Sequence, residues 1–363
     1  MKRIISLLMI LVMLFTLAAC GPGESGPGES NPTESIPVEI VPTESAPLES
    51  GAVETSYPVT VTDQLGRQVT IEQEPETLVS GYYISTSLLI ALGLESRLVG
   101  IEAKAGSRNI YKLSAPQVID LPSVGTAKEF NLEGCAALEP DLVILPAKLQ
   151  SVIPSLEELG FTVIALNPED KALLEEAVTL LGAVTNTSAR AEELLAFHDK
   201  QLEPLAGALD GADAPGVYLA GNSAFLSVAG PLMYQNSLIE QAGGANAAAD
   251  ITGDYWAEIS YEQLLAWDPD FIILAADANY TVESVLQDEN MQSCTAVKNG
   301  NVYQFPNAIE AWDSPVPSSI LGSMWLAGVI HPEIFPADGW KQAATDYYET
   351  FYGFTPNLDE PYA

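Results

Sequence analysis

The sequence predicts an α/β protein made of two lobes, each with a central parallel sheet, joined by one long helix and separated by a ligand cleft. The first observation is a repeat: residues 131–145 and 260–274 lie 129 residues apart and are identical at six of fifteen positions. Each copy reads as a polar N-cap, a short helix with a glutamate in its first turn, a Pro-Asp break and an apolar strand. The second observation is the alternation of strand and helix patterns, which is typical of parallel sheets covered by helices. A duplicated unit of this kind predicts two similar lobes.

The elements of the first lobe follow from turn signals and apolar runs. Two short strands within 59–71 flank an Asp-Gln-Leu-Gly turn. The later elements alternate in type: strands at 78–79, 98–101, 142–145 and 162–166, and helices at 85–92, 131–139 and near 153–159. This order predicts one parallel sheet with helices on its faces.

The second lobe repeats that pattern. Its predicted elements are strands at 217–220, 225–228 and 302–305, a helix near 237–242, the second copy of the repeat, and a closing helix from about 318 to 329. The segment from Ser237 to Gly243 is a weaker counterpart of the one from Ser87 to Gly93. Both observations favour a duplicated architecture.

A single helix is expected to connect the lobes. Residues 188–209 are rich in Ala, Glu, Leu and Lys and contain no glycine before Gly207, so they would form a rod of about 30 Å. Because the chain after the tether is too long for one comfortable core, we expect an N-terminal lobe at 57–185, the linking helix at 186–210 and a C-terminal lobe at 211–363. A stiff helical connection would allow little closure.

The amino terminus predicts export. Lys2 and Arg3 precede an apolar run that ends in Leu17-Ala-Ala-Cys20, which describes a secretory signal peptide too short for a confident spanning helix. The ending resembles the bacterial lipoprotein lipobox, in which the cysteine is lipidated. We therefore expect residues 1–19 to be a signal peptide and Cys20 to anchor the protein on the extracytoplasmic face of the cell membrane. The alternatives are an uncleaved anchor and a soluble secreted protein.

A tether is predicted between the anchor and the lobes, at residues 20–56. Prolines and glutamates recur there every five residues, from Pro22 and Glu24 onward. With little apolar surface to bury, this stretch should stay extended. Its reach would be roughly 35 Å as a coil and about 110 Å when stretched.

These features resemble the substrate-binding proteins of ABC importers for ferric siderophores, haem and cobalamin, over residues 57–355. The resemblance rests on Val61-Thr-Asp-Gln-Leu-Gly-Arg67, the segment from Leu92 to Ile101, Val124-Gly125 before the first repeat, the Pro-Asp strands and the linking helix. It implies two Rossmann-like lobes bridged by one backbone helix. It also implies a monomer whose partners are an ABC permease with its ATPase and a metal-chelate or corrinoid ligand, with no nucleic acid.

For Glu133 and Glu262, the resemblance implies docking. In relatives, glutamates at these two motif positions enter arginine pockets on the two permease subunits, a contact suited to bidentate charge pairing. The alternative for each glutamate is ordinary helix chemistry, since an acid in a first turn gains about 0.3–1 kcal/mol from the helix dipole.

Basic residues gather on one part of a chain whose net charge is −35. Five of the fourteen lysines and arginines fall between 104 and 148: Lys104, Arg108, Lys112, Lys128 and Lys148. They follow strands that end at one edge of the predicted sheet, where ligands bind in such folds. We therefore expect Arg108, Lys128 and Lys148 to contact an anionic ligand group. Scattered solvated lysines are the alternative.

Aromatic residues near strand ends complete the predicted pocket: Tyr82, Tyr83, Tyr255, Trp256 and Trp312. Each lies where relatives line the cleft, and flat rings suit a macrocycle or an aromatic chelate. About half of these residues are expected to be structural, because aromatic side chains near strand ends often belong to the core.

The second lobe lacks a basic residue at one informative position. Some relatives carry arginine where this chain has Ser318, and only Lys298 and Lys341 remain as basic residues after Lys200. We expect a cleft that is basic on the first lobe and aromatic to acidic on the second. Such a cleft favours a larger ligand of mixed polarity over a small symmetric oxyanion.

Metal and catalytic chemistry have no visible apparatus in the sequence. His198 and His331 are the only histidines and have no partners at ligand spacing, so no resident metal or other cofactor is expected. Cys135 and Cys294 fall in different lobes, and no disulfide is predicted between them. No nucleophile motif or phosphate loop occurs. We therefore expect a protein that is not an enzyme.

The leading hypothesis is a surface-anchored substrate-binding protein of an ABC importer that captures an iron chelate, as siderophore or haem, or cobalamin. The alternatives are the same fold binding an oxyanion such as molybdate, a binding or sensor module without transport, and a chelatase-like enzyme. The sequence does not choose among the ligands.

Overall fold

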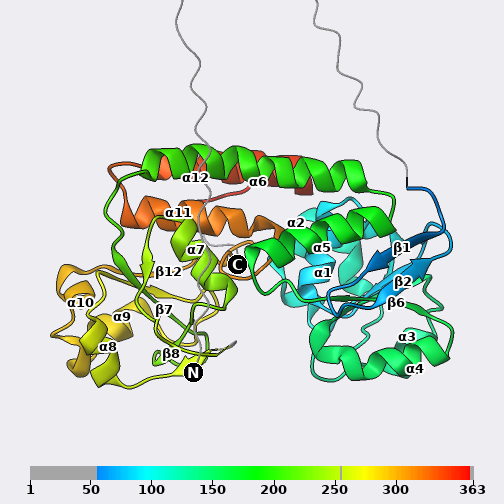
Figure 1. The fold of residues 1–363 in the computed structure, drawn as a ribbon, viewed down its shortest axis with the longest axis horizontal. Coiled ribbons are helices and arrows are strands. Elements are labelled where there is room, and N and C mark those ends of the chain that lie inside the picture. The colour runs from blue at the N-terminus through cyan, green and yellow to red at the C-terminus, as the bar shows by residue number, and fades with distance from the viewer. Residues whose placement is uncertain (1–54, 254–255, 360–363) are drawn as a thin grey trace, which may run out of the picture. The chain divides into compact units, whose positions relative to one another are not determined.

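The computed structural model describes residues 55–253 and 256–359. The predictions for the signal peptide, for Cys20, for nearly all of the tether and for Tyr255 lie outside these residues. These described residues form one compact unit, in which two α/β lobes lie below the long helix α6 (Figure 1).

The N-terminal lobe is built on four parallel strands in the order β4, β3, β5, β6. These strands are β3 (Leu78–Ser80), β4 (Leu98–Gly100), β5 (Leu142–Pro146) and β6 (Thr162–Leu166), and an antiparallel hairpin of β1 (Val59–Thr62) and β2 (Gln68–Ile71) lies beside them. The helices are α1 (Tyr83–Ala91), α2 (Asn109–Ser114), α3 (Leu132–Ala136), α4 (Ile153–Glu158) and α5 (Lys171–Val184). All five residues of β5 are buried, as expected for a central strand covered on both faces.

The C-terminal lobe has a mixed sheet in the order β10, β8, β7, β11, β12, with β9 also paired to β7. The strands are β7 (Gly216–Ala220), β8 (Ser227–Val228), β9 (Ala245–Asn246), β10 (Ala257–Glu258), β11 (Phe271–Leu274) and β12 (Val302–Gln304). The helices are α7 (Tyr234–Gln241), α8 (Tyr261–Trp267), α9 (Val282–Leu286), α10 (Thr295–Asn299), α11 (Ile320–Ile330) and α12 (Ala337–Tyr352). Strands β7, β11 and β12 are parallel to one another, whereas β8 pairs antiparallel with both β7 and the end strand β10. The predicted α/β class with two lobes and central parallel sheets is confirmed.

The two copies of the repeat form matching units in the two lobes. Helix α3 leads to β5, and α8 leads to β11, and each strand is central in its sheet. The Pro-Asp identity has a physical reason: Asp141 Oδ2 accepts hydrogen bonds from the backbone N–H of Thr77 at 2.9 Å, and Asp270 Oδ2 accepts one from Gly216 N–H at 2.8 Å. Each aspartate therefore joins its own strand to the start of the neighbouring strand, β3 or β7.

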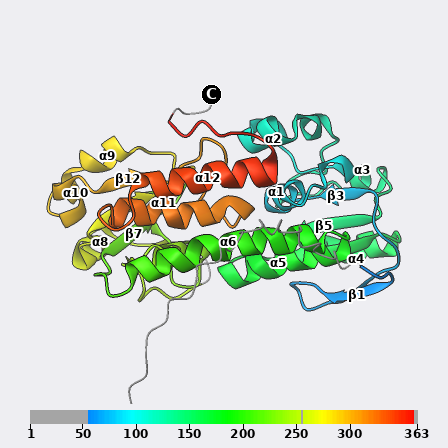
Figure 2. The ribbon, with the colours of Figure 1, turned by 90° about the horizontal axis from the view of Figure 1, so that it is seen from above.

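The connecting helix α6 (Ser188–Leu209) lies within the segment predicted to link the lobes. It packs against α5, α11 and α12, and Figure 2 shows these helices side by side. One continuous cluster of buried side chains runs from Leu88 in the first lobe through Leu194 of α6 to Ile239 and Tyr347 in the second lobe. The lobes thus share a core, which opposes large movements between them.

Further bonds join the lobes near the cleft. The backbone N–H of Ile110 donates to Ile309 O at 3.0 Å, and Asn109 Nδ2 donates to Ala308 O at 2.8 Å. Ser87 Oγ donates to the Glu310 carboxylate at 2.6 Å. These three contacts connect α1 and α2 directly to the loop after β12.

His198 of α6 should make the stability of the protein depend on pH. Its Nε2 lies 2.9 Å from Pro317 O and donates to it, and burial lowers the pKa of His198 to about 4. The unfolded chain would bind a proton near pH 6.5, so folding free energy is lost as pH falls from 6.5 towards 4, by about 3 kcal/mol. We expect His198→Gln, which keeps a donor for Pro317, to flatten this loss in urea unfolding at pH 7, 6 and 5. Parallel curves for the two proteins would contradict this assignment.

Across residues 55–253 and 256–359, the helices are too short or too polar to cross a lipid bilayer.

Candidate functional site

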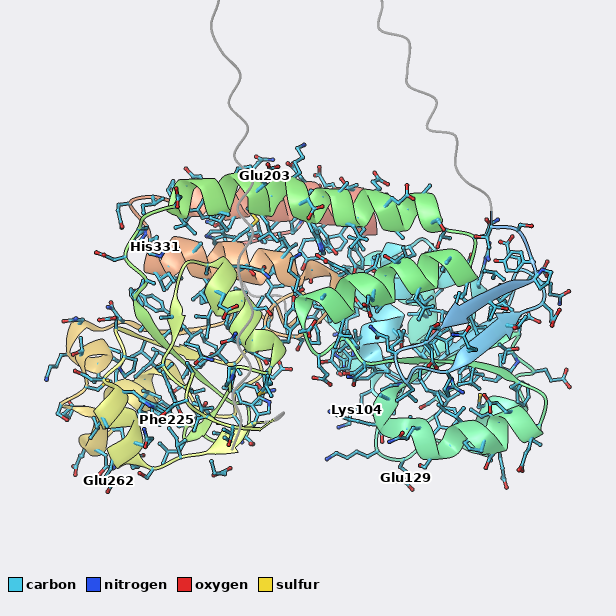
Figure 3. The ribbon with its side chains drawn as sticks, viewed as in Figure 1. Lys104, Glu129, Glu203, Phe225, Glu262 and His331 are labelled. Carbon is cyan, nitrogen blue, oxygen red and sulfur yellow. The ribbon has the colours of Figure 1, made fainter. Side chains whose placement is uncertain are left out.

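A cavity of about 430 Å³ lies between the lobes, and we call it the interlobe cavity. The N-terminal lobe lines it with Tyr83, Lys104, Ser107, Arg108, Asn109 and Ile110, and the C-terminal lobe with Asn222, Asp277, Asn307, Ile309, Glu310, Ala311 and Ser314. A second cavity of about 210 Å³ shares Tyr83, Lys104 and Arg108 and adds Tyr82 and Glu102. Figure 3 shows Lys104 on the side of its lobe that faces the other lobe.

Arg108 is the central cation of the interlobe cavity. It follows the short turn Ala105–Ser107 after β4 and precedes the first residue of α2. Its guanidinium carbon lies 4.0 Å from the centroid of the Tyr83 ring, which is a cation–π arrangement. Its Nε is buried, has no hydrogen-bond partner among the described residues and is 3.4 Å from Glu102 Oε1. A buried donor without a partner is rare in folded proteins and is common where a ligand completes the bonding.

Glu102 is the acidic partner of Arg108. It is buried and accepts hydrogen bonds from Thr86 Oγ1 at 2.6 Å and from Tyr111 OH at 2.9 Å. Burial raises the pKa of Glu102, while these two hydrogen bonds and the Arg108 charge act in the opposite direction. The carboxyl group is therefore committed to its two hydroxyl donors, and it orients Arg108 through charge.

Tyr82 and Tyr83 both line the second cavity, and Tyr83 also lines the interlobe cavity. Their rings meet edge to face with centroids 5.0 Å apart. Burial raises the pKa of Tyr83 to about 12, although a hydrogen bond with Ser314 and the charge of Arg108 oppose this shift. Burial also raises the pKa of Tyr82. Both phenols therefore remain neutral near pH 7 and can donate hydrogen bonds.

The opposite wall comes from loops that follow β7, β11 and β12. Asn222 follows β7, Asp277 follows β11 and Asn307 follows β12. Because the carboxyl ends of parallel strands meet at one edge of a sheet, these loops converge on the cavity. Asn307 Nδ2 donates to Ala276 O at 2.8 Å, which fixes the loop after β11 against the loop after β12.

Glu310 contributes a buried carboxyl to this wall. It accepts hydrogen bonds from Ser87 Oγ at 2.6 Å and Ser318 Oγ at 2.5 Å, and burial raises its pKa. Ser318 is fully buried beneath it. Ser318 lines neither of the two cavities described above. Asp313 is also buried, which raises its pKa to about 6.

The predicted residues do not all reach the cavity. Lys128 is exposed in a turn closed by the bond from Glu129 N–H to Thr126 O, and Lys148 is exposed in the short helix Ala147–Val152. Neither lines the two cavities described above. Following the end of a strand places a residue at the right edge of the sheet, but it does not set the direction of the side chain.

The two tryptophans among the predicted site residues, Trp256 and Trp312, differ in their surroundings. Trp256 is half-buried and packs against Gly221, where an added Cβ would lie 2.8 Å from its ring. It therefore sits beside Asn222 of the cavity wall. Trp312 is only 2% exposed, and its Nε1 donates to Tyr348 OH at 2.8 Å. This residue belongs to the core rather than to the cavity lining.

Sequence reasoning missed the amide and carboxylate lining, namely Asn109, Asn222, Asp277 and Asn307. A signal was available for Asp277, since it stands 129 residues after Lys148 and thus occupies the matching place after the repeat. No comparable signal marks the three asparagines.

Glu133 and Glu262 do not line the interlobe cavity and are exposed in the first turns of α3 and α8. Asn131 Oδ1 accepts from Gly134 N–H at 2.9 Å and Ser260 Oγ from Gln263 N–H at 3.3 Å. A backbone hydrogen bond and one from Ser260 lower the pKa of Glu262. Helices α3 and α8 lie at the ends of their lobes that point away from α6 and α12 (Figure 1).

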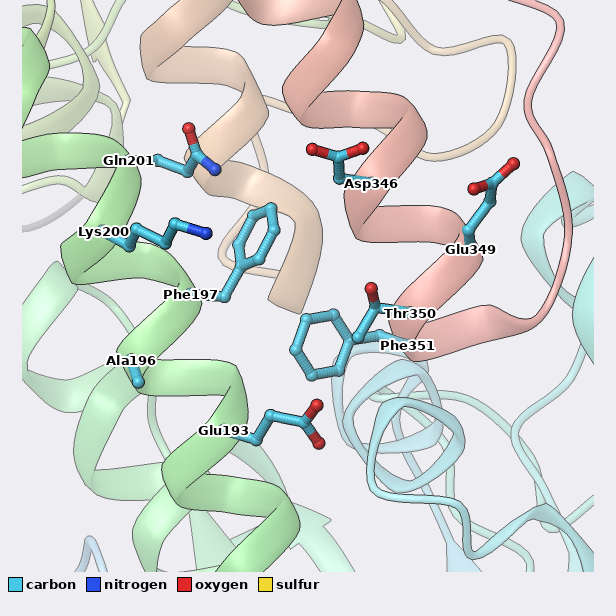
Figure 4. A pocket seen from close by; sticks show the side chains of 9 residues that line it. All are labelled: Glu193, Ala196, Phe197, Lys200, Gln201, Asp346, Glu349, Thr350 and Phe351. Carbon is cyan, nitrogen blue, oxygen red and sulfur yellow. The ribbon is translucent and has the colours of Figure 1, made fainter. Parts of the chain in front are cut away.

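A larger cavity of about 580 Å³ lies elsewhere, between α6 and α12 (Figure 4). Its lining combines two phenylalanines with charged groups: Glu193, Ala196, Phe197, Lys200, Gln201, Asp346, Glu349, Thr350 and Phe351. It is a shallow furrow on the helical side, remote from the strand ends. For this reason we assign the functional site to the smaller interlobe cavity.

Metal-binding and cysteine chemistry add nothing to the site. Within the part of the chain that the structure describes, no three His, Cys, Asp or Glu side chains are grouped to hold a metal ion. Cys135 and Cys294 are both buried and free.

Known proteins resemble this chain over most of its length. Residues 78–309 match the family described as periplasmic binding protein. The molybdate-binding protein MolA of Haemophilus influenzae is 28% identical over 323 residues, covering 80% of this chain and 90% of the relative. The ABC transporter substrate-binding lipoprotein YvrC of Bacillus subtilis, itself uncharacterized, is 23% identical over 77% of this chain and 87% of its own. A cobalamin-binding protein of Halobacterium salinarum is 27% identical over 68% of each chain.

Solved structures agree on the fold. A periplasmic solute binding protein from Veillonella parvula superimposes with a TM-score of 0.71 at 27% identity, covering 83% of this chain and 94% of that one. The family match spans well over half of the chain and includes both strands of the repeat. The chain therefore belongs to the periplasmic binding protein family, among the substrate-binding proteins of ABC transporters.

Proposed function

We propose that this protein is held on the extracytoplasmic face of the membrane through a lipid on Cys20, captures an anionic iron chelate in the interlobe cavity, and delivers it to an ABC permease through Glu133 and Glu262. The permease and its ATPase are the partners, and the protein itself catalyses no reaction. Cobalamin and haem belong to the same proposed ligand class of metal complexes.

The observation that carries the proposal is the environment of Arg108. Its guanidinium stacks on Tyr83, its buried Nε has no hydrogen-bond partner among the described residues, and it lines a cavity that both lobes form. A guanidinium presents its N–H groups in a fork that matches carboxylate and other planar oxygen pairs. Lys104 adds a second cation at the same wall. The wall is therefore suited to oxygen atoms that carry negative charge.

The size of the cavity favours a chelate over a bare oxyanion. Sites for small organic ligands typically measure about 300–1,000 Å³, and the interlobe cavity measures about 430 Å³ with a second cavity of about 210 Å³ beside it. A single tetrahedral oxyanion would fill only a small part of this space.

Molybdate is the second candidate, because a relative that shares 28% of its residues with this chain is named as molybdate-binding. Molybdate would use the same cations, so affinity for it alone would not refute the site. It would, however, replace the iron chelate as the proposed cargo.

A ligand panel tests the proposal. We would titrate the purified protein with ferric citrate, haem, cyanocobalamin and sodium molybdate, and follow tryptophan fluorescence, since Trp256 packs beside the cavity. The absorption spectrum of protein from its native source would reveal a retained haem or corrinoid. We expect an iron complex to bind in the micromolar range or tighter and molybdate to bind more weakly. Tight molybdate binding with no response to iron complexes or cobalamin would overturn the chelate assignment.

A further inference from the structure

Charge is divided between the two walls of the interlobe cavity. The N-terminal lobe contributes the cations Lys104 and Arg108, and the C-terminal lobe contributes the carboxyl groups of Asp277 and Glu310. Amide and hydroxyl side chains make up much of the remaining lining. A purely anionic ligand would be attracted by one wall and repelled by the other.

The two acidic residues are not equivalent. The Glu310 carboxyl is buried, receives hydrogen bonds from two serines and has a raised pKa. Asp277 is exposed to the cavity. Its nearest described donor is Asn307 Nδ2 at 3.4 Å, and that amide already donates to Ala276 O at 2.8 Å. Within residues 55–253 and 256–359 Asp277 joins no ion pair. Its carboxylate is therefore available to a ligand.

The internal repeat gives Asp277 a counterpart in the other lobe. Asp277 follows β11 at the position that Lys148 occupies after β5. The equivalent positions just after the duplicated unit therefore carry a negative residue in one lobe and a positive one in the other. Lys148 does not line the interlobe cavity, whereas Asp277 does. The acidic character of the second wall is thus concentrated at one side chain.

We infer that Asp277 is a specificity-determining residue, which selects a ligand with an anionic part against Lys104 and Arg108 and a cationic or hydrogen-donating part against the C-terminal lobe. It discriminates against ligands that are anionic throughout, because specificity often depends on a repulsive element as well as an attractive one. The inference rests on the proposed function, since it takes the anionic part to lie at Arg108. The substrate class that fits is a metal chelate with amine, ammonium or amide groups at its rim.

The test compares the wild type with Asp277→Asn, which keeps shape and removes charge. The anionic probes are sodium molybdate and ferric citrate, and ferrioxamine B, a ferric hydroxamate with a free ammonium group, is the third probe. In 50 mM salt we expect D277N to bind the two anions about three- to tenfold more tightly and ferrioxamine B less tightly. The gain should shrink in 0.5 M salt, because exposed charges are screened.

Glu283→Gln provides the matched control. Glu283 is an exposed carboxylate on α9 of the same lobe and does not line the interlobe cavity. We expect E283Q to change the affinity for each probe less than twofold. An equal gain in both variants would assign the effect to the net charge of the protein and overturn the role of Asp277.

The outcomes separate this inference from the proposed function. If Arg108→Gln weakens anion binding but D277N does not strengthen it, the inference fails and the proposed site stands. If R108Q has no effect on anion binding, the proposed site itself fails. No difference between wild type and D277N for any of the three probes, including the case in which none binds, overturns the inference.

Discussion

The double variant Glu133→Ala, Glu262→Ala should lower ligand uptake by cells at least about tenfold while leaving the dissociation constant of the purified protein unchanged. Both carboxylates are exposed on helices at the ends of their lobes and do not line the interlobe cavity. Losing one partner of a buried interfacial charge pair costs about 2–5 kcal/mol, so the loss of two such anchors should prevent productive docking. Radiolabelled iron uptake and fluorescence titration measure the two quantities separately.

The matched control for this prediction is Glu192→Ala, Glu203→Ala. These glutamates are exposed on α6, on the opposite side of the molecule, where Figure 3 labels Glu203. Removing the same amount of charge there should leave uptake nearly unchanged. Normal uptake by the E133A/E262A variant would refute the docking role and leave only helix chemistry. In that case the two glutamates would act only by favouring the first turns of α3 and α8.

The variant Arg108→Gln should weaken binding of the anionic ligand by about 10- to 100-fold. A hydrogen bond to a charged group contributes about 1.5–3 kcal/mol, and glutamine offers neither the charge nor the forked donors of arginine. Arg108→Lys should recover the charge but not the fork, and should fall between the wild type and R108Q. Fluorescence titration gives the affinities, and urea unfolding shows whether the variants remain folded beside Glu102.

Lys128→Gln is the control for Arg108. Lys128 is exposed in a turn and lines neither of the two cavities that contain Arg108. We expect K128Q to weaken binding less than twofold at 0.15 M salt, because exposed charges at a distance are screened. A loss as large as that of R108Q would mean that the basic residues act together through their long-range field, and that Arg108 has no special role.

The sequence predicted those parts of the fold that depend on local pattern. The repeated units are recognisable because a helix cap, a Pro-Asp break and a buried strand all leave their marks within fifteen residues. Strand β8 lies within the strand predicted at 225–228, whereas β10 was not predicted, because two paired positions leave no local pattern. Helix α12 was not predicted, although it covers α1, α6 and α11. Its burial comes from contacts with segments far away in the sequence.

In the candidate site too, the sequence predicted only those residues that a local pattern marks. Tyr83 and Arg108, both predicted to line the cleft, lie against each other, because each follows a strand of one sheet and the two strands are neighbours. Trp312 lies in the core, where Tyr348 of α12 accepts its indole hydrogen bond. Because α12 was not predicted, there was no reason to expect this contact from the sequence. The asparagines were missed because a single polar residue in a loop has no pattern of its own. Asp277 was missed because the comparison of the two repeat copies ended at the strand, three residues before it.

If Glu133 and Glu262 dock on a permease as proposed, the core that runs through both lobes has a consequence for how loaded and empty receptors compete for it. If the lobes barely move, the two docking glutamates keep nearly the same separation whether or not cargo is present. Empty receptors would then occupy permeases almost as well as loaded ones. On this view, the rate of uptake would depend on the fraction of receptors that are loaded, and raising the number of receptors without raising the supply of ligand would slow transport.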